Sequence, residues 1–457
     1  MKSIINKNDI LTLTIDSYTH DGMGIGRTAD NFVIFIPDSA AGDIVECKIV
    51  KTAKTHAYGR IERIISRSEH RITPACSVHV RCGGCCFQHI DYSEELRLKE
   101  QRIKDAFSRI ANIDISAFIE PIIKANEISE YRNKCQYPTG IEDNGKAFAG
   151  FYSARSHRLV QSESCSIIPK IFSNIATSVC KWSDENGIQI YNETNHSGIL
   201  RHIYLRMGKT SGEIMVCLVI TKGIPSTSLV DYLTERFENI SSICLNFNNE
   251  KSNVILGDRV KTIYGNDTIT DTLGNLIFNL SPLSFFQVNP AQTERLYATA
   301  LDYASLSGNE TLLDFYCGIG TISLFMAKHA KTVYGIEIIA DAVENARENA
   351  RINGIQNASF ICGDAADVSR DLKNQGISAD IVVLDPPRKG CDEKLINTVL
   401  ETAPEKIVYI SCDPGTLARD TALFIKSGYK LSKIRPVDMF PRTAHVECVV
   451  LLQRTNT

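Results

Sequence analysis

The chain has 457 residues, a formal net charge of −3 and 43% hydrophobic residues. Its length suits two or three domains, because single cores stop growing near ~250 to 300 residues, and its charge excludes a uniformly basic nucleic-acid binder. The chain opens without a charged-then-apolar leader and contains no apolar run near the ~18 to 20 residues of a membrane span, so we expect a cytoplasmic protein without membrane contact.

The 15 cysteines are expected to be free thiols in a reducing compartment. Clustered cysteines then indicate metal binding or catalysis, and scattered ones indicate core positions.

Residues 9–66 are predicted to form short β-strands that close into a small barrel. Leu11, Leu13 and Ile15 alternate with polar residues, and the stretch His20–Arg27 has the composition of a turn. A barrel is the simplest closure for several short strands of this kind.

Basic residues gather in the later half of this segment, at Lys48, Lys51, Lys54, Arg60, Arg63, Arg67 and Arg71. Such a run is usually a solvated strand face, but on an oligonucleotide-binding type of barrel it can follow a phosphate backbone. Through the D-G-x-G-I-G-R turn and the run Ile36–Asp43, the segment resembles the TRAM module. That resemblance implies an OB-like barrel over residues 1–67 that binds RNA.

The next stretch contains a cysteine constellation. Cys76, Cys82 and Cys85 have the spacing C-x5-C-x2-C, with glycines between the last two, and Cys165 in a polar loop is the candidate fourth ligand. Four cysteines suit either zinc or an iron-sulfur cluster, and the spacing leaves both open. Cys86 adjoins Cys85 and is interpreted as a packing residue.

Residues 68–280 are predicted to form an α+β domain. An amphipathic helix over Tyr92–Ile110 places Leu96, Ile103, Phe107 and Ile110 on one, core-facing side. Mixed short strands and helices over 121–280 then predict an antiparallel sheet backed by helices.

Basic and aromatic side chains are interleaved in this domain. They are Arg132, Lys134, Arg155, His157, Arg158, Arg201, His202 and Arg206, beside Tyr131, Tyr137, Phe151 and Tyr152. This mixture suits single-stranded RNA, whose bases stack and whose phosphates pair with cations. Any one of these residues is more often ordinary sheet surface.

Residues 281–457 alternate strands and helices regularly. The predicted strands are Leu312–Tyr316, Thr332–Ile336, Ser359–Cys362, Asp380–Leu384, Lys406–Ile410, Lys430–Asp438 and Val446–Gln453. The predicted helices run from the first strand to about His329 and over Ala340–Asn353, Val368–Asn374, Glu393–Ala403 and Thr416–Ser427. This alternation predicts an α/β, Rossmann-like parallel sheet whose final strand pair matches class I methyltransferases.

The turn after the first strand is predicted to bind an adenosine cofactor. Gly318 and Gly320 let the backbone turn and approach a ligand, and Glu337 ends the next strand, where a carboxylate can accept hydrogen bonds from ribose hydroxyls. Ser323 stands where a dinucleotide fingerprint has a third glycine, so S-adenosylmethionine fits better than NAD. Polar residues end five strands, at Asp314, Glu337, Asp364, Asp385 and Cys412.

Cys412, in a Ser-Cys-Asp-Pro turn, is the candidate nucleophile, although a cysteine after a strand is more often core. Carbon 5 of uracil accepts a methyl group only after a thiolate has attacked C6. A base must then remove the C5 proton so that the cysteine can leave. Glu447 is the candidate base, and His445 is a competitor.

Six motifs occur in the order LSFFQVN, DFYCGIGT, GIE, LDPPR, SCDP and TAHVEC. Together they resemble the RNA uracil-5-methyltransferase family over nearly the whole chain, which implies a TRAM barrel, a central iron-sulfur domain and a seven-stranded catalytic domain. The resemblance implies a [4Fe-4S] cluster on Cys76, Cys82, Cys85 and Cys165. It implies S-adenosylmethionine contacts at Gln287, Tyr316, Glu337 and Asp385, with Cys412 as nucleophile and Glu447 as base.

Two further positions of the resemblance concern cofactor and base. Thr321 stands where several members carry asparagine, which leaves that cofactor contact in doubt, and Phe285 matches an aromatic residue near the target base.

The TRAM and cysteine segments favour 23S rRNA over tRNA as the RNA partner, and the sequence indicates no obligate protein partner. Two other classes stay open: an RNA N-methyltransferase, which needs no cysteine nucleophile, and a non-catalytic RNA-binding protein with a structural metal.

Overall fold

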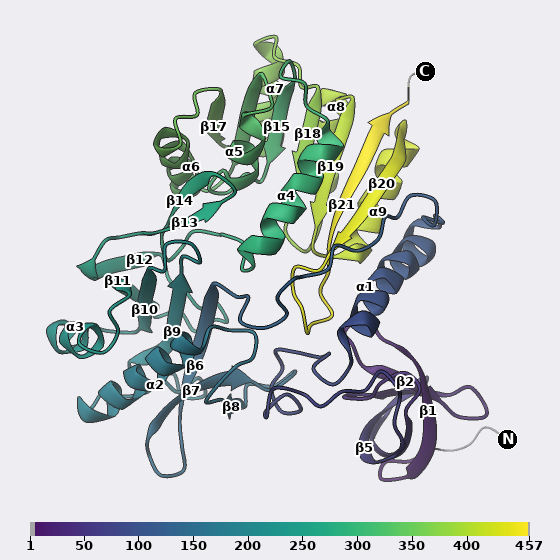
Figure 1. Cartoon of the computed structure of the whole chain (residues 1–457), viewed down its shortest axis with the longest axis vertical. Coiled ribbons are helices and arrows are strands. Elements are labelled where there is room, and N and C mark those ends of the chain that lie inside the picture. Colours follow the sequence, from purple (N-terminus) through teal and green to yellow (C-terminus); the bar gives the residue numbers. More distant parts are fainter. Residues whose placement is uncertain (1–4, 456–457) are drawn as a thin grey trace. The chain divides into compact units, whose positions relative to one another are not determined.

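The computed structural model describes residues 5–455. Its chain separates into two compact units (Figure 1). The first unit comprises Met1–Arg102, Phe151–Ser166 and Phe440–His445, and the second comprises Ile103–Gly150, Ile167–Met439 and Val446–Thr457. The predicted division into three domains, at residues 67 and 280, stays a prediction. Of the helices described, none is both long and apolar enough to cross a membrane.

The first unit contains the predicted barrel. Its strands are β1 (Ile10–Tyr18), β2 (Gly24–Arg27), β3 (Val33–Ile36), β4 (Ile44–Thr52) and β5 (His56–Ser66), closed in the order β1-β2-β3-β5-β4. Alternate residues such as Leu13, Ile15 and Val45 fill the interior. Gly59 is needed there, because a Cβ at this position would lie 2.0 Å from the Cys47 Sγ.

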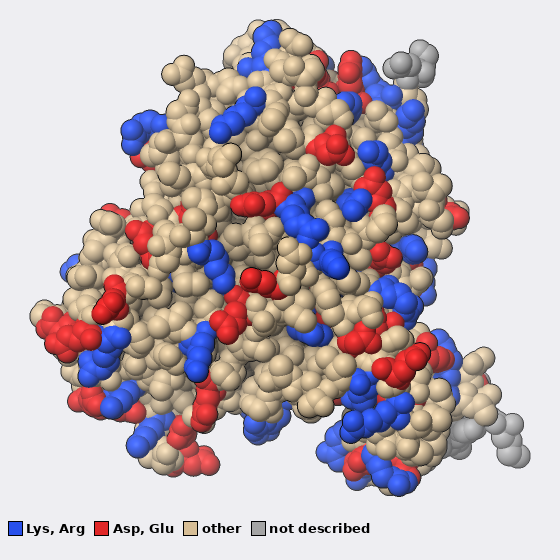
Figure 2. Space-filling view, viewed as in Figure 1, with Lys and Arg blue, Asp and Glu red and all other residues tan. Residues whose placement is uncertain are grey.

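The basic run on the barrel is partly neutralised within the protein. Arg63 forms an ion pair with Glu46 at 2.7 Å, and Arg71 is largely buried, where it pairs with the buried carboxylate of Asp43. Several Lys and Arg side chains nevertheless gather over the barrel on the face shown in Figure 2, where acidic residues lie among them. The run is therefore a mixture of free and paired cations.

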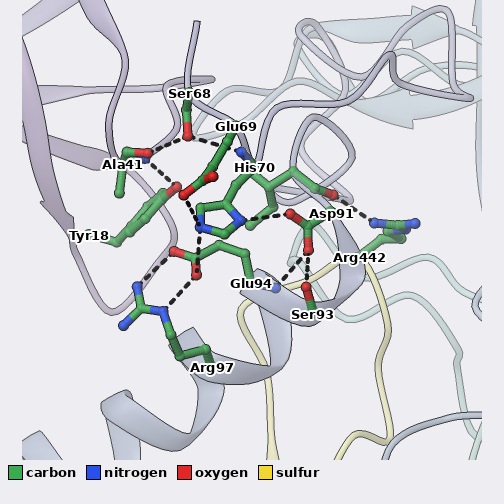
Figure 3. Close-up of polar contacts among 11 residues, drawn as sticks. Tyr18, Ala41, Ser68, Glu69, His70, Asp91, Ser93, Glu94, Arg97 and Arg442 are labelled. Carbon is green, nitrogen blue, oxygen red and sulfur yellow. Dashed lines mark hydrogen bonds and ion pairs between the residues drawn. The ribbon is translucent and has the colours of Figure 1, made fainter.

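A polar network joins the end of the barrel to the start of α1 (Tyr92–Ala106) (Figure 3). His70 Nδ1 donates to Asp91 Oδ2 at 2.8 Å, and Asp91 Oδ1 accepts from the Glu94 amide at 2.9 Å. Arg97 Nε in turn donates to Glu94 at 2.6 Å. These contacts fix the first turn of the helix. The first unit also contains the short strand β8 (Leu159–Gln161).

The predicted helix over 92–110 is present, but the prediction that all four of its apolar residues face the core is wrong for one of them. Phe107 and Ile103 are buried as predicted, whereas Ile110 is exposed. The chain widens into a π-helical turn, η1 (Phe107–Ala111), after the α-helical part. Residues in that turn no longer follow the 3.6-residue spacing, so Ile110 leaves the apolar side.

The second unit contains a mixed sheet in the order β12-β11-β10-β9-β6-β7. These strands are β6 (Lys134–Ile141), β7 (Ala147–Tyr152), β9 (Leu200–Met207), β10 (Ile214–Ile220), β11 (Ile240–Phe247) and β12 (Arg259–Gly265). The helices α2 (Lys170–Glu185) and α3 (Ser226–Thr234) accompany them. The prediction of an antiparallel sheet fails at one pair, because β10 and β11, joined by a crossover through α3, are parallel.

A seven-stranded sheet follows in the order β17-β16-β15-β18-β19-β21-β20. Its strands are β15 (Thr311–Phe315), β16 (Thr332–Glu337), β17 (Ala358–Cys362), β18 (Ile381–Leu384), β19 (Lys406–Ser411), β20 (Tyr429–Val437) and β21 (Glu447–Arg454). All pairs are parallel except those that β21 makes with β19 and β20. This arrangement confirms the predicted class I methyltransferase fold.

Helices alternate with these strands, and a hairpin precedes them. The helices are α4 (Pro290–Ala304), α5 (Thr321–Ala327), α6 (Ala340–Ile352), α7 (Ala365–Asn374), α8 (Glu393–Thr402) and α9 (Pro414–Lys426), and the hairpin is β13 (Ile269–Leu273) with β14 (Leu276–Leu280). Helix α4 packs on β19, β20 and β21. Apolar side chains such as Val382 and Val450 are fully buried in the core.

Candidate active site

The carboxyl ends of the parallel strands bring the predicted polar residues to one edge of the sheet. Asp314, Glu337 and Asp385 lie at the ends of β15, β16 and β18, and Cys412 directly follows β19. In the sheet these strands are neighbours, in the order β16-β15-β18-β19. Ligands of open parallel sheets bind at this edge, so the order of strands gathers the candidate site.

The glycine turn after β15 contains residues in the left-handed region of backbone conformation. Gly320 has φ +83° and Tyr316, a non-glycine residue, has φ +66°. A Cβ at Gly320 would lie 2.9 Å from the Phe360 ring, whereas a Cβ at Gly318 would meet open space. The turn therefore packs closely on one side and leaves room for a ligand on the other.

Glu337 is held beside this turn by backbone amides. One carboxylate oxygen accepts from Gly318 N at 3.2 Å, and the other accepts from Ile338 N at 2.8 Å and Ile339 N at 3.0 Å. These contacts fix the direction of the carboxylate. The Glu337 carboxylate ends β16, the position predicted for a group that accepts hydrogen bonds from ribose hydroxyls.

Three carboxyl groups at this edge are buried, and the charge of one of them, Asp385, acts on the other two. Burial, followed by neighbouring negative charge, raises the pKa of Asp314 to about 7 and that of Glu447 to about 8, and burial alone raises the pKa of Asp385 to about 7. Ser323 Oγ donates to Asp314 at 2.5 Å. A positively charged ligand would stabilise the ionised forms of all three groups. The cluster thus fits the sulfonium of S-adenosylmethionine.

Cys412 is half-buried in a turn that is fixed on both sides. Asp413 Oδ1 accepts from Gly415 N at 2.9 Å and thereby caps α9, and Ser411 Oγ accepts from Asp413 N at 3.2 Å. Burial, then the charges of Glu447 and Asp385, raises the pKa of the Cys412 thiol to about 12, while the guanidinium of Arg388 lowers that pKa. Cys412, Glu447 and Asp385 therefore lie within electrostatic reach of one another.

The loop that precedes α4 presents two further predicted residues. Gln287 is buried, and its carbonyl accepts from Asn133 Nδ2 at 3.0 Å. Phe285 is 64% exposed. Thr321 Oγ1 lies 3.0 Å from Tyr297 Oη, so this hydroxyl has a partner on α4.

Two further residues shape the site without having been predicted from the sequence. Tyr297 of α4 is buried, and burial, followed by the negative charges of Asp385, Asp314 and Glu447, raises the pKa of its hydroxyl above the ordinary value. Arg388 belongs to the LDPPR motif, and its charge lowers the pKa of both Cys412 and Glu447. Only the motif identifies Arg388, and no local pattern marks Tyr297.

Comparison with protein families gives two matches. Residues 91–455 match the model for tRNA (uracil-5-)-methyltransferases, and residues 6–61 match the TRAM domain. The chain belongs to the uracil-5-methyltransferase family. It is accordingly an RNA methyltransferase of a family that depends on S-adenosylmethionine, and the predicted TRAM barrel is confirmed.

Relatives and solved structures agree with this uracil-5-methyltransferase assignment. An uncharacterized RNA methyltransferase of Halalkalibacterium halodurans is 43% identical over 455 residues, which cover 99% of this chain and 98% of the relative. One of Clostridium tetani is 44% identical over 450 residues, 98% and 97% of the two chains. The crystal structure of the Pyrococcus abyssi tRNA (uracil-54, C5)-methyltransferase with S-adenosyl-L-homocysteine has a TM-score of 0.77 at 28% identity and covers 96% of this chain and 99% of its own.

The four cysteines of this methyltransferase lie in its first unit as half-buried thiols. The Gly83 amide donates to Tyr152 O at 3.0 Å, which holds the cysteine loop against the segment that leads to Cys165. The pKa of Cys82 is raised by burial, and the charge of Cys76 adds to that increase.

Across residues 5–455, no group of three or more His, Cys, Asp or Glu side chains is arranged to hold a metal ion. The thiol chemistry of the four cysteines suits a cluster, but a metal site is not shown. Cys86 packs closely against Gly22, because a Cβ added at Gly22 would lie 2.8 Å from the Cys86 Sγ. This contact agrees with a packing role for Cys86.

Proposed function

We propose that the protein transfers a methyl group from S-adenosylmethionine to C5 of a uridine in 23S rRNA, through a covalent adduct between Cys412 and C6 of the uracil. The observation that carries the proposal is the electrostatic proximity of Cys412, Glu447 and Asp385 in a chain of the uracil-5-methyltransferase family. A thiol, a base and a cofactor carboxylate are the three groups that this chemistry requires.

The proposed reaction has three steps. The Cys412 thiolate forms a bond to C6, and the electron pair of the C5–C6 double bond moves to the C4 oxygen as an enolate. The enolate electrons then form a bond from C5 to the methyl carbon, while the bond from that carbon to the positively charged sulfur of S-adenosylmethionine breaks and leaves its electron pair on sulfur, which gives S-adenosylhomocysteine. Glu447 removes the remaining C5 proton, and the electron pair of that C–H bond restores the double bond as the Cys412–C6 bond breaks.

The charges around Cys412 indicate how its thiolate would form. With a pKa of about 12, the Cys412 thiol is protonated at neutral pH in the free protein. Arg388 already favours the thiolate, and a cationic cofactor beside Asp385 would add to that effect. We therefore propose that thiolate formation follows cofactor binding.

The cofactor residues are proposed to act as follows. Glu337, held by three backbone amides, binds the ribose. Tyr316 and Gln287 supply the other proposed cofactor contacts. Asp385 lies closest to the reaction, because its charge acts on both Cys412 and Glu447.

The substrate is proposed to be 23S rRNA, with tRNA as the second candidate. The TRAM barrel and the cysteine segment favour rRNA. The similarity to the Pyrococcus abyssi tRNA (uracil-54, C5)-methyltransferase over 96% of this chain makes tRNA the second candidate. In either RNA the target base must leave its stack, at roughly a few kcal/mol.

We further propose that Cys76, Cys82, Cys85 and Cys165 hold a [4Fe-4S] cluster. Support comes from four half-buried cysteines in one compact unit and from the close packing between the Gly83 loop and Ala154. Four cysteines can supply the four thiolate ligands that a [4Fe-4S] cluster requires. The cluster takes no part in the proposed methyl transfer.

The proposed function is tested with transcripts of 23S rRNA and tRNA that carry tritium at C5 of uridine. Methylation at C5 releases tritium to water, whereas N-methylation of a base or RNA binding alone leaves it in place. We expect release that depends on S-adenosylmethionine and is faster with 23S rRNA. Methyl transfer without tritium release would overturn the uracil-5 assignment, and release from tRNA alone would reverse the choice of substrate.

A further inference from the structure

The loop Ser281–Val288 is held rigidly by the mixed sheet of the second unit. Arg206, buried in β9, donates through Nη1 to Ser281 O and through Nη2 to Ser284 O, both at 2.6 Å. The Asn133 amide donates to Val288 O at 2.9 Å at the other end of the loop. Arg206 and Asn133 therefore determine where this loop stands.

The held loop exposes apolar side chains. Phe285 is 64% and Leu283 44% exposed, while the alternating residues Ser284 and Phe286 are buried. Exposing apolar groups on a rigid loop costs free energy, and such an arrangement is typical of a binding surface. A flat aromatic ring is a stacking surface for an unpaired base.

A cation lies beside this ring. Lys134 begins β6 opposite Arg206 of β9, and its Nζ lies 5.7 Å from the centroid of the Phe285 ring. Among the residues that the structure describes, neither Lys134 nor Arg132 forms an ion pair with an acid, and Arg132 Nε is buried without a hydrogen-bond partner. Cations gathered this way without a counter-charge are stabilised by an anionic ligand.

The electrostatics of Lys134 agree with its crowding. Burial, followed by the charges of Arg206 and Arg132, lowers the pKa of the Lys134 ammonium to about 7. Arg206 and Arg132 are the charged groups that face it, and the loop Ser281–Val288 contributes no ionisable side chain. A bound anion would restore the protonated form.

We propose that Lys134 and Arg132 form a binding site for a backbone phosphate of single-stranded RNA, beside a base that stacks on Phe285. This site deepens the proposed function, since it would hold the RNA next to the target uridine. A phosphate is favoured over the carboxylate of the cofactor because the cations lie beside an exposed aromatic ring, and single-stranded nucleic acids combine stacking with backbone contacts.

The test measures binding of a fluorescent single-stranded oligoribonucleotide that contains uridine, in the presence of S-adenosylhomocysteine. Lys134→Ala should weaken binding about tenfold or more and reduce the slope of log affinity against log salt by about 0.7. Lys134→Arg should keep both. Lys261→Ala is the matched control, because Lys261 is an exposed lysine on β12 at the far edge of the same sheet, and it should bind like the wild type.

A pH series supplies a readout that a merely structural role would not move. Wild-type affinity for the oligonucleotide should fall between pH 6 and pH 8.5 as Lys134 loses its proton, by up to tenfold per pH unit above its pKa. Lys134→Arg stays charged, so its affinity should fall less over the same range. An equal decrease in both proteins would contradict the assignment of the cation.

Two outcomes separate this proposal from the proposed function. If the wild type binds the oligonucleotide through Lys134 but releases no tritium from labelled uridine, only the proposed function fails. If tritium is released and Lys134→Ala keeps the wild-type KM for RNA, affinity and salt slope, the phosphate site is wrong. Weaker binding of S-adenosylhomocysteine with unchanged RNA binding would also overturn it, since the anion would then be the cofactor's carboxylate.

Discussion

Replacing Glu447 with glutamine should separate the formation of the RNA adduct from its breakdown. Glu447 is 3% exposed, and its charge is the largest electrostatic contribution to the raised pKa of Cys412. At pH 8 a thiol with a pKa of about 12 is ionised in about one molecule in ten thousand. Because the pKa of Glu447 is about 8, its carboxylate is ionised in about half of the molecules at that pH, so removing the charge should increase the thiolate fraction about twofold.

The second effect of the same substitution is opposite in direction. Without a general base the C5 proton is removed about 10²- to 10⁴-fold more slowly. Attack on C6 is therefore retained or accelerated while elimination is slowed. We expect Glu447→Gln to methylate the uridine once and then to remain bound covalently to the RNA.

Two assays check these effects. A denaturing gel with labelled RNA detects the adduct, and peptide mass spectrometry after timed alkylation with iodoacetamide reports the reactivity of Cys412. Glu405→Gln is the control, because Glu405 is an exposed carboxylate just before the first residue of β19, whereas Cys412 follows the last residue of that strand. Normal turnover of Glu447→Gln without adduct, together with unchanged alkylation of Cys412, would refute the reasoning.

Three further results are expected. Cys412→Ala should abolish methylation and leave binding of S-adenosylhomocysteine nearly unchanged, and appreciable turnover would remove the thiolate mechanism. Anaerobically purified protein should be brown and should lose its broad visible absorbance in Cys82→Ser, whereas a colourless protein with zinc would contradict the cluster. Because the pKa values of Asp314, Asp385 and Glu447 are raised to about 7, 7 and 8, their stabilising contribution is present below about pH 4 and is lost as pH rises through those values. The melting temperature of the free protein should therefore fall between pH 5 and 8.5, and S-adenosylmethionine should bind more tightly at pH 8 than at pH 6. A pH-independent melting temperature would contradict the raised pKa values of these three carboxyl groups.

Local sequence patterns predicted the catalytic fold well. The strands β15 to β19 are short apolar runs, each followed by a helix-like stretch, so alternation and polar strand ends were visible along the chain. The placement of Cys412 after β19 follows from that pattern alone. The placement of Glu447, which begins β21, follows from the final strand pair.

Other features depend on contacts between distant residues and left no local signal. The hydrogen bonds from Arg206 to Ser281 and Ser284 join segments about 75 residues apart in the chain. The first unit is likewise built from three separate stretches of chain. The wrong placement of Ile110 has a local cause, since a π-helical turn changes the spacing of side chains without a recognisable sequence pattern.

The most direct test of the account is mass spectrometry of digested 23S rRNA and tRNA from a strain that lacks the gene. The account predicts loss of 5-methyluridine from 23S rRNA and its recovery when the wild-type gene, but not Cys412→Ala, is restored. Unchanged 5-methyluridine in both RNAs would contradict it.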